Sequence, residues 1–235
     1  MHLFYAPDIE TTGLLPDEEA THCLRVLRLR EGDAIDITDG KGNFFRSIIA
    51  EVGKRSVRVD LESRTPWEKT WGIDIHLAVA PTKNADRMEW LCEKACEIGL
   101  DKLTFLECRY SERRSLKTDR LRKILISAMK QSLKGSLPVL EEMMPFEQFV
   151  RLERPGRKFI AHCHEGEKHS LAEAILPQGT ACTLLIGPEG DFSEEEVKTA
   201  TACGYEPISI GRSRLRTETA ALAAVALLNL QHQKQ

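Results

Sequence analysis

Hydrophobic and polar residues alternate along the first part of the chain, as they do in short strands with one buried face. Three segments are predicted as strands on this pattern: residues 34–38, 44–52 and 57–61. The polar, glycine-containing residues 39–42 predict a turn between the first two, and one helix is expected at about 17–27. The pattern predicts a compact β-barrel that ends at a linker, residues 64–67.

From Ile73 onward the pattern changes to strands of five or six residues separated by helices, which is typical of an α/β domain. One helix is predicted to begin with Asp86 as its capping carboxylate and to end at Gly99. Another is predicted at about 118–132, with one apolar face and one basic face.

Two segments near the C-terminus have the same layout, in which a short apolar strand ends at a glycine and a helix follows. The first strand, residues 184–186, leads into Gly187, Pro188, Glu189 and Gly190, and the second, residues 208–210, leads into Gly211. A glycine directly after a buried strand lets a ligand lie against the main chain. Neither turn has the spacing of a dinucleotide fingerprint or a phosphate-binding loop. Two adjacent turns therefore predict a pocket whose ligand is contacted mainly by main-chain groups. Two ordinary strand-to-helix loops of an α/β domain would give the same sequence pattern.

Helix signals accompany both turns. Ser193 with Glu196 three residues later forms a capping box, and Gly204 is the expected end of that helix. Residues 220–230 are apolar on nearly every side, as expected for a helix buried by its own domain and by another subunit. A helix buried within one subunit would have a similar sequence.

Composition limits the class of protein. The 235 residues suffice for a small domain plus a medium one, and no apolar run approaches the roughly 18 residues of a membrane span. The first residues lack the pattern of a signal peptide, so we expect a cytoplasmic protein. Seven scattered cysteines without a Cys-x-x-Cys pair indicate reduced thiols. Cys92 and Cys96 share one face of a predicted helix, where we expect them to be buried. We expect no metal at the His162, Cys163, His164 and His169 cluster.

The net charge of −3 hides a basic block. Between residues 109 and 134 the balance is +7, from nine bases and two acids. Such a block supplies sequence-independent affinity for phosphates, and a solvated helix face normally mixes both signs. The block therefore favours contact with RNA.

Several of these motifs together resemble one family. Residues 186–190 and 211–220 resemble the C-terminal signature of the bacterial 16S ribosomal RNA uridine-N3 methyltransferases, which belong to the SPOUT class. Residues 83–99 resemble the central helix of that family, and residues 22–32 with 39–40 resemble its N-terminal domain. The similarity spans nearly the whole chain in the right order.

The resemblance implies a small PUA-like β-barrel domain that binds RNA over residues 1–70. It implies a SPOUT-type α/β methyltransferase domain over residues 71–235, whose C-terminal trefoil knot holds S-adenosylmethionine. It also implies a homodimer, with the final helix and the knot region at the interface. The expected substrate is 16S rRNA in the small ribosomal subunit, methylated at N3 of a uridine.

The same resemblance assigns roles to individual residues. The expected cofactor contacts are Ile186, Gly187, Gly190, Ile210, Gly211 and Leu215. The loop after the strand at 158–161, which contains His162, Cys163 and His164, resembles a loop that lines the cofactor pocket. Arg216 is the candidate for stabilising the substrate anion, because uridine N3 must lose a proton before it can attack a methyl group. Glu189 and Glu218 are candidates for the base, although Glu189 also suits a turn acceptor and Glu218 a helix-dipole partner. The candidate RNA contacts are Arg28, Lys83, Arg87, Arg109, Arg113, Arg114, Arg122, Lys130 and Lys134.

Two positions depart from the family pattern. The family commonly reads Gly-Pro-Glu-Gly-Gly, whereas this chain has Asp191 at the last position, and it tends to have arginine where this chain has Lys134. Lysine keeps the charge but loses bidentate geometry. Two alternatives remain: a SPOUT enzyme that methylates another rRNA or tRNA position, and a non-catalytic RNA-binding assembly factor.

Overall fold

The structure, a computed structural model, describes residues 2–234 and divides into two compact units. The first unit takes residues up to 69 together with 126–137, and the second takes 70–125 and the chain from 138 onward. The division falls within helix α4 (Thr118–Gln131), whose bounds agree with the helix predicted at 118–132. Within the described residues, no helix has the length and apolar character needed to cross a membrane.

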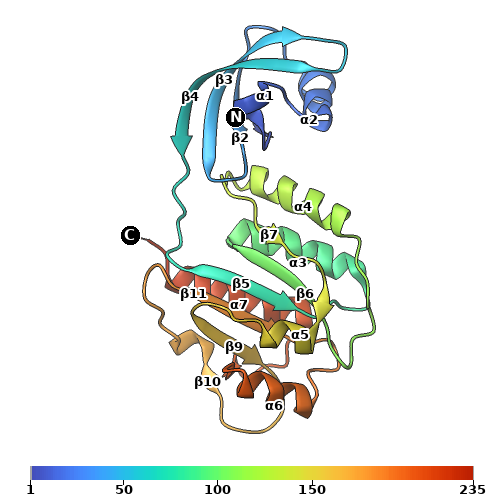
Figure 1. The fold of residues 1–235 in the computed structure, drawn as a ribbon, viewed down its shortest axis with the longest axis vertical. Helices are drawn as coiled ribbons and strands as arrows, with labels where there is room; N and C mark the ends of the chain where they lie inside the picture. Colours follow the sequence, from blue (N-terminus) through green and yellow to red (C-terminus); the bar gives the residue numbers. More distant parts are fainter. Residues whose placement is uncertain (1, 235) are drawn as a thin grey trace. The chain divides into compact units, whose positions relative to one another are not determined.

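The first unit contains a four-stranded sheet in the order β1-β2-β3-β4 (Figure 1). Its strands are β1 (Leu3–Tyr5), β2 (Ala34–Thr38), β3 (Asn43–Val52) and β4 (Val57–Pro66). β1 pairs with β2 in parallel, and the other two pairings are antiparallel. Alternate side chains, among them Ile35, Ile37, Phe45 and Ile49, enter one buried core, which confirms the strand prediction.

Three local features of this unit differ from the sequence interpretation. The predicted helix at 17–27 is an α-helix, α2 (Asp17–Thr21), continued by a π-helix (His22–Val26). A four-residue helix, α1 (Ile9–Thr12), gave too short a pattern to be predicted. The predicted linker at 64–67 is wrong because β4 stays paired with β3 as far as Pro66, opposite Asn43. Pro66 ends the strand, where the loss of its N–H costs least.

The second unit is built on an eight-stranded sheet in which every described pairing is parallel. The order is β10-β12-β9-β11-β5-β6-β7, and β8 also pairs with β6. The strands are β5 (Asp74–Val79), β6 (Lys102–Glu107), β7 (Val139–Leu140), β8 (Met144–Pro145), β9 (Arg157–Ala161), β10 (His169–Ser170), β11 (Ala181–Ile186) and β12 (Glu206–Ser209). This arrangement confirms the predicted α/β class.

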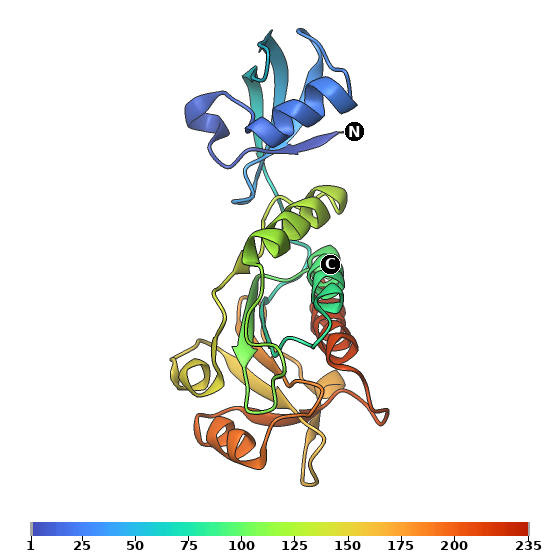
Figure 2. The same cartoon turned by 90° about the vertical axis from the view of Figure 1, so that its right-hand side faces the viewer.

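Helices cover both faces of this sheet (Figure 2). One face carries α3 (Ala85–Ile98) and α7 (Thr217–Gln231), and the other carries α5 (Phe146–Arg151) and α6 (Glu194–Ala202). A short 3-10 helix (Leu171–Glu173) before β11 contacts α7. The strands are therefore buried on both sides, which explains their nearly continuous apolar sequences.

The helix ends follow their capping residues. The capping box of Ser193 and Glu196 is present at the start of α6, as predicted. The cap of α3 is Asn84, whose side chain accepts from the N–H of Asp86 at 2.9 Å, so the assignment of the cap to Asp86 was wrong. The predicted stop at Gly99 is confirmed, with φ +135 and its N–H donated to the carbonyl of Ala95.

Buried residues of α7 follow one stripe: Ala221, Ala224, Val225 and Leu228. Other apolar residues of the helix are half-buried, and Leu230 is 69% exposed. Burial of the remaining surface by a second subunit stays a prediction. All seven cysteines are free thiols, and Cys92 and Cys96 are buried in α3.

Candidate functional site

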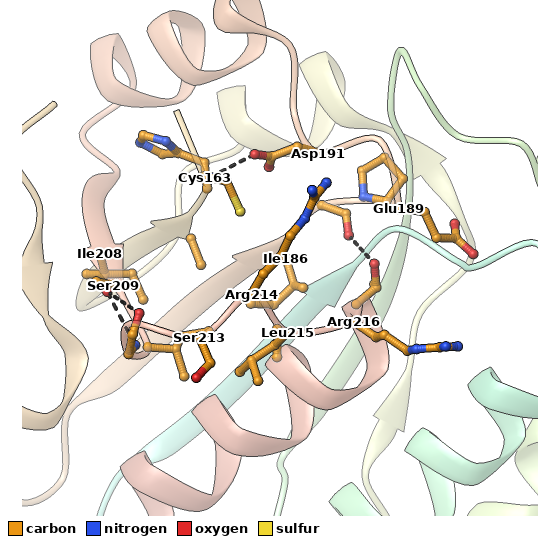
Figure 3. Close-up of a pocket in the computed structure, with 18 of the residues that line it drawn as sticks. Cys163, Ile186, Glu189, Asp191, Ile208, Ser209, Ser213, Arg214, Leu215 and Arg216 are labelled. Atoms are coloured by element: carbon orange, nitrogen blue, oxygen red, sulfur yellow. Dashed lines mark hydrogen bonds between the residues drawn. The ribbon is translucent and has the colours of Figure 1, made fainter. Parts of the chain in front are cut away.

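A cavity of about 460 Å³ lies at the carboxyl ends of three adjacent strands, β12, β9 and β11 (Figure 3). Its walls come from residues 161–163 at the end of β9, 186–189 and 191 at the end of β11, and 208–211 and 213–217 at the end of β12. The sequence placed two turns next to each other, whereas β9 lies between β11 and β12 and supplies a third wall. The carboxyl edge of a parallel sheet is the usual place for a ligand.

The two glycine turns differ in what they do. At Gly187, a Cβ would lie 3.0 Å from the amide N of Phe192, so the turn closes too tightly for a side chain. The carbonyl of Gly187 accepts a hydrogen bond from Thr217 Oγ1 at 3.0 Å, which ties this turn to the start of α7. Gly211 has φ +156, and a Cβ there would meet no atom within 4 Å. Since Gly211 lines the cavity, bare main chain faces free space at this point.

The structure brings together most of the residues predicted to contact a cofactor. Ile186, Gly187, Ile210, Gly211 and Leu215 all line the cavity. Gly190 does not line it and lies against the side chain of Tyr110, where a Cβ would be 3.0 Å from Tyr110 Cβ.

The resemblance placed the loop after β9 at the cofactor pocket, and its residues His162 and Cys163 line the cavity. The lining residues that the sequence interpretation did not name as contacts are Ala161, Pro188, Asp191, Ile208, Ser209, Ser213, Arg214, Thr217 and Ala220. Ala161 is the last residue of β9, so the loop after it stands at the end of a short apolar strand, as the two glycine turns do. It lacks a glycine directly after the strand. Residues 213–217 connect Gly211 to the start of α7. Because both ends of this segment lie at the cavity, the segment itself is part of the wall.

Charged side chains gather at one end of the cavity. Arg87, Glu189, Arg214 and Arg216 line it, and Arg216 is the N-cap residue of α7. The carboxylate of Glu189 accepts from the main-chain N–H of Lys83 at 3.0 Å. In Figure 3 the side chains of Arg214 and Arg216 extend in different directions from the same segment.

Glu218, the third predicted catalytic residue, does not line the cavity, although its neighbour Thr217 and its ion-pair partner Arg87 do. Its residue surface is only 8% exposed, and one carboxylate oxygen is 3.3 Å from Arg87 Nη1. The other oxygen is buried and has no hydrogen-bond partner among the described residues. Buried polar atoms are nearly always paired, so an unpaired carboxylate oxygen at this place is unusual.

The histidine-rich loop after β9 is part of the cavity wall. Burial lowers the pKa of His162, and the neighbouring Lys168 cation lowers it further. His164 Nε2 donates to the carbonyl of Phe192 at 2.6 Å. No group of three or more metal-ligating side chains occurs in residues 2–234.

Several basic residues follow β6 at this same edge of the sheet. The Arg113 guanidinium donates to the carbonyls of Thr82 and Lys83, at 3.2 and 2.6 Å, and so braces the loop before α3. The others form exposed ion pairs: Arg109 with Glu195, Arg114 with Glu107, and Lys83 with Glu112. Exposed pairs contribute about 0–1 kcal/mol each, so a phosphate can replace the carboxylate.

The remaining RNA candidates lie on α4 or in the first unit. Arg122 is exposed on α4. In the first unit, Lys130 Nζ lies 2.5 Å from Glu19 Oε1 and is largely buried, so it serves that unit's packing more than its surface. Lys134 is half-buried, whereas Arg28 is exposed and has φ +57.

The chain is similar to proteins that modify RNA. A model of the RNA methyltransferase domain matches residues 69–229, and a model of the RNA methyltransferase PUA domain matches residues 15–62. The crystal structure of a probable rRNA-methyltransferase from Porphyromonas gingivalis is 43% identical, with 99% of this chain and 98% of that one covered and a TM-score of 0.93.

Two further relatives carry more specific names. A ribosomal RNA small subunit methyltransferase E from Neisseria gonorrhoeae, solved bound to S-adenosyl methionine, is 26% identical, with 98% and 97% of the two chains covered and a TM-score of 0.85. The ribosomal RNA small subunit methyltransferase E of Rickettsia conorii is 29% identical over 221 residues, which are 92% of this chain and 88% of that protein.

Proposed function

The chain belongs to the RNA methyltransferase family, and from that premise we propose that it transfers a methyl group from S-adenosylmethionine to N3 of a uridine in 16S rRNA. The observation that carries the proposal is the cavity itself. Its walls are the glycine turns after β11 and β12, at the edge of a parallel sheet where ligands bind.

The residues present fit S-adenosylmethionine. A volume of about 460 Å³ lies within the range of small-molecule pockets, roughly 300–1,000 Å³. Ile186, Ile210 and Leu215 supply apolar contacts, and Gly187 and Gly211 bring main-chain groups close to the ligand. When bound, the cofactor supplies an activated methyl group on a positively charged sulfur.

The remaining chemistry falls to the chain's own side chains. Uridine N3 carries a proton, and negative charge develops on the two carbonyl oxygens of the base as that proton leaves. We assign stabilisation of this charge to Arg216, which lines the cavity and cannot lose its own proton. We assign acceptance of the proton to Glu218 in preference to Glu189. Glu218 has a carboxylate oxygen without a partner among the described residues, whereas the Glu189 carboxylate already accepts from Lys83 N–H.

The RNA is proposed to approach from the edge where residues 109–114 follow β6, because these bases and the cavity belong to the same edge of the sheet. The domain over residues 1–70 is proposed as a second RNA-binding element. A homodimer, with the knot region and α7 at its interface, completes the proposal. Its substrate, the small ribosomal subunit, places the enzyme in the cytoplasm.

The test is methyl transfer from labelled S-adenosylmethionine to small ribosomal subunits that lack the modification, with free 16S rRNA and tRNA alongside. Label mapped to N3 of a uridine in 16S rRNA is the expected result. Label only in tRNA, or at another rRNA position, would show that the proposed substrate is wrong and would leave the assignment as a methyltransferase intact. RNA binding without any transfer would identify a non-catalytic assembly factor.

A further inference from the structure

Asp191 stands in a backbone conformation that most residues avoid. Its φ is +67, in the left-handed region, at the position where the resembling family commonly has a glycine. Aspartate and asparagine tolerate this region better than other residues with a side chain. The turn therefore keeps the shape that a glycine would allow, and gains a carboxylate.

That carboxylate joins two walls of the cavity. One oxygen accepts from the main-chain N–H of Cys163 at 2.7 Å (Figure 3). The other oxygen accepts from the N–H of Phe192 at 2.8 Å. A second contact joins the same two loops, because His164 Nε2 donates to the carbonyl of Phe192 at 2.6 Å. The loop after β9 is thus tied to the turn after β11 through two consecutive residues on each side.

The turn after β11 is itself firmly anchored. Phe192 is fully buried, and its ring centroid lies 5.3 Å from that of Phe146 in α5. The next residue, Ser193, is the cap of α6. By contrast, Cys163 is exposed, and Gly166 with φ +130 adds freedom to the loop after β9. The tie therefore holds a flexible loop against a rigid turn.

Ala161, His162 and Cys163 form one wall of the cavity, and Gly187, Pro188 and Glu189 belong to another. The distance between these walls depends on what joins them. Charge-assisted hydrogen bonds from a main-chain N–H to a carboxylate are about twice as strong as neutral ones. We propose that Asp191 is a positioning residue that sets the width of the cofactor pocket by fixing the loop after β9. The proposal rests on the assignment of this pocket to S-adenosylmethionine.

Three substitutions separate the two properties of Asp191. Asp191→Asn keeps both the tolerance of positive φ and an oxygen that accepts from Cys163 N–H. Asp191→Gly keeps the backbone conformation and removes the acceptor. Asp191→Ala removes the acceptor and also places a poorly tolerated side chain at φ +67.

The test measures the full-length protein in two ways. The first is the dissociation constant of S-adenosylmethionine by calorimetry, together with KM and kcat on small ribosomal subunits. The second is amide hydrogen exchange of residues 162–164 without cofactor. We expect Asp191→Gly to weaken cofactor binding about tenfold, the loss of one charge-assisted hydrogen bond. The exchange of the Cys163 amide should become faster, and the loss of activity should appear in the KM for S-adenosylmethionine more than in kcat.

Asp191→Asn should fall between wild type and Asp191→Gly in both readouts, because its one acceptor oxygen keeps a neutral hydrogen bond from Cys163 N–H. Asp191→Ala should be weaker than Asp191→Gly. Wild-type affinity and unchanged exchange in Asp191→Gly would overturn the proposal. So would an Asp191→Asn variant as weak as Asp191→Gly, since that result would assign the effect to charge instead of the tie. If the wild-type protein binds the cofactor but does not methylate 16S rRNA, the proposed function fails and the exchange result still decides the role of Asp191.

Discussion

Both edges of the parallel sheet carry polar side chains, but only near the amino edge do they join in a continuous network that ends at a carboxylate. Near the amino ends of β5 and β6, Arg154 Nη1 lies 3.2 Å from His76 Nδ1, and His76 Nε2 lies 2.7 Å from Thr104 Oγ1. Thr104 Oγ1 in turn donates to Glu141 at 2.6 Å. Because arginine can only donate, His76 accepts at Nδ1 and donates from Nε2 to Thr104. The chain of hydrogen bonds ends at the carboxylate of Glu141. The Arg154 guanidinium also stacks on the Phe149 ring, 3.9 Å from its centroid.

This network determines the charges of its members. Burial lowers the pKa of His76 to about 3, and the Arg154 cation adds to the effect. Burial acts to raise the pKa of Glu141, but hydrogen bonds from Thr104 and Lys102 outweigh it and lower that pKa. His76 is therefore neutral and Glu141 ionised at neutral pH, which is the arrangement that the direction of these hydrogen bonds requires.

The carboxyl edge is different. There Glu218 keeps a buried oxygen without a partner among the described residues, and Gly211 presents bare main chain to the cavity. At the amino edge both oxygens of Glu141 accept hydrogen bonds and only the donor Arg154 Nε lacks a partner among the described residues, so no acceptor is left for a ligand. An edge that keeps an unpaired acceptor loses stability and can bind. The comparison assigns stability to the amino edge and binding to the carboxyl edge.

The largest effect that would break this division is expected at Gly211. A valine there would extend into the cavity and would be strained at φ +156. Cofactor affinity should fall by about 3 kcal/mol, roughly 100-fold, when measured by calorimetry. The matched control is Gly179→Val, because Gly179 also has positive φ and open space around it but does not line the cavity. Equal affinity in the two variants would show that the cofactor binds elsewhere.

The next effect concerns the proton. Glu218→Gln should reduce kcat by about 100-fold or more, the usual range for loss of a general base, with little change in cofactor affinity. Arg87→Gln breaks the same ion pair and keeps the carboxylate, so it separates the two causes. Glu189→Gln should have the smaller effect. A larger loss of kcat in Glu189→Gln than in Glu218→Gln would reverse the assignment.

At the amino edge the expected effect is on stability and depends on pH. The unfolded chain protonates His76 below about pH 6.5, whereas the folded protein does not until about pH 3. The unfolded state thus binds more protons between these values, and stability falls as the pH falls through this window. The slope from this residue is about 1.4 kcal/mol per pH unit.

Urea denaturation at pH 7.5, 6.5 and 5.5 measures this slope. His76→Gln should be less stable than wild type at pH 7.5 but should lose less stability on acidification, and its kcat at neutral pH should be unchanged. Identical slopes in the two proteins would remove His76 as the titrating group. A large loss of kcat in this variant would contradict the division between the edges.

The smallest effect is expected on the basic surface beyond the cavity. Arg114→Glu with Arg122→Glu should weaken RNA binding roughly tenfold and lower the salt dependence by about 0.7–0.9 for each phosphate that the protein no longer neutralises. Filter binding at several salt concentrations measures both. Arg113 is left intact because it braces the carbonyls of Thr82 and Lys83. Lys198→Glu on α6 is the control. An equal loss of RNA affinity in that variant would show that only the net charge of the protein matters, and not the position of Arg114 and Arg122.

Much of the fold was predictable because its signals are local. The strand at 34–38, the helix at 118–132 and the capping box of Ser193 and Glu196 each depend on residues within a few positions of one another. The cavity-lining residues Gly187 and Gly211 were found for the same reason, since a glycine directly after a buried strand is visible in the sequence.

Contacts between distant parts of the chain decided the rest. No local pattern says that β9 inserts between β11 and β12. Only the resemblance indicated that the loop after residues 158–161 lines the pocket, and the tie from Asp191 to Cys163 was not predicted. Nor does any local pattern say that residues 126–137 pack with the first unit. Gly190 has the same residue type and nearly the same position as Gly187, yet it lies against Tyr110.

The elements and their turns could thus be derived from the order of residues, because they follow from backbone preferences and periodicity over short stretches. Which turns meet around one cavity depends on strand order. Strand order comes from pairing between segments far apart in the chain, and that pairing leaves no local signal.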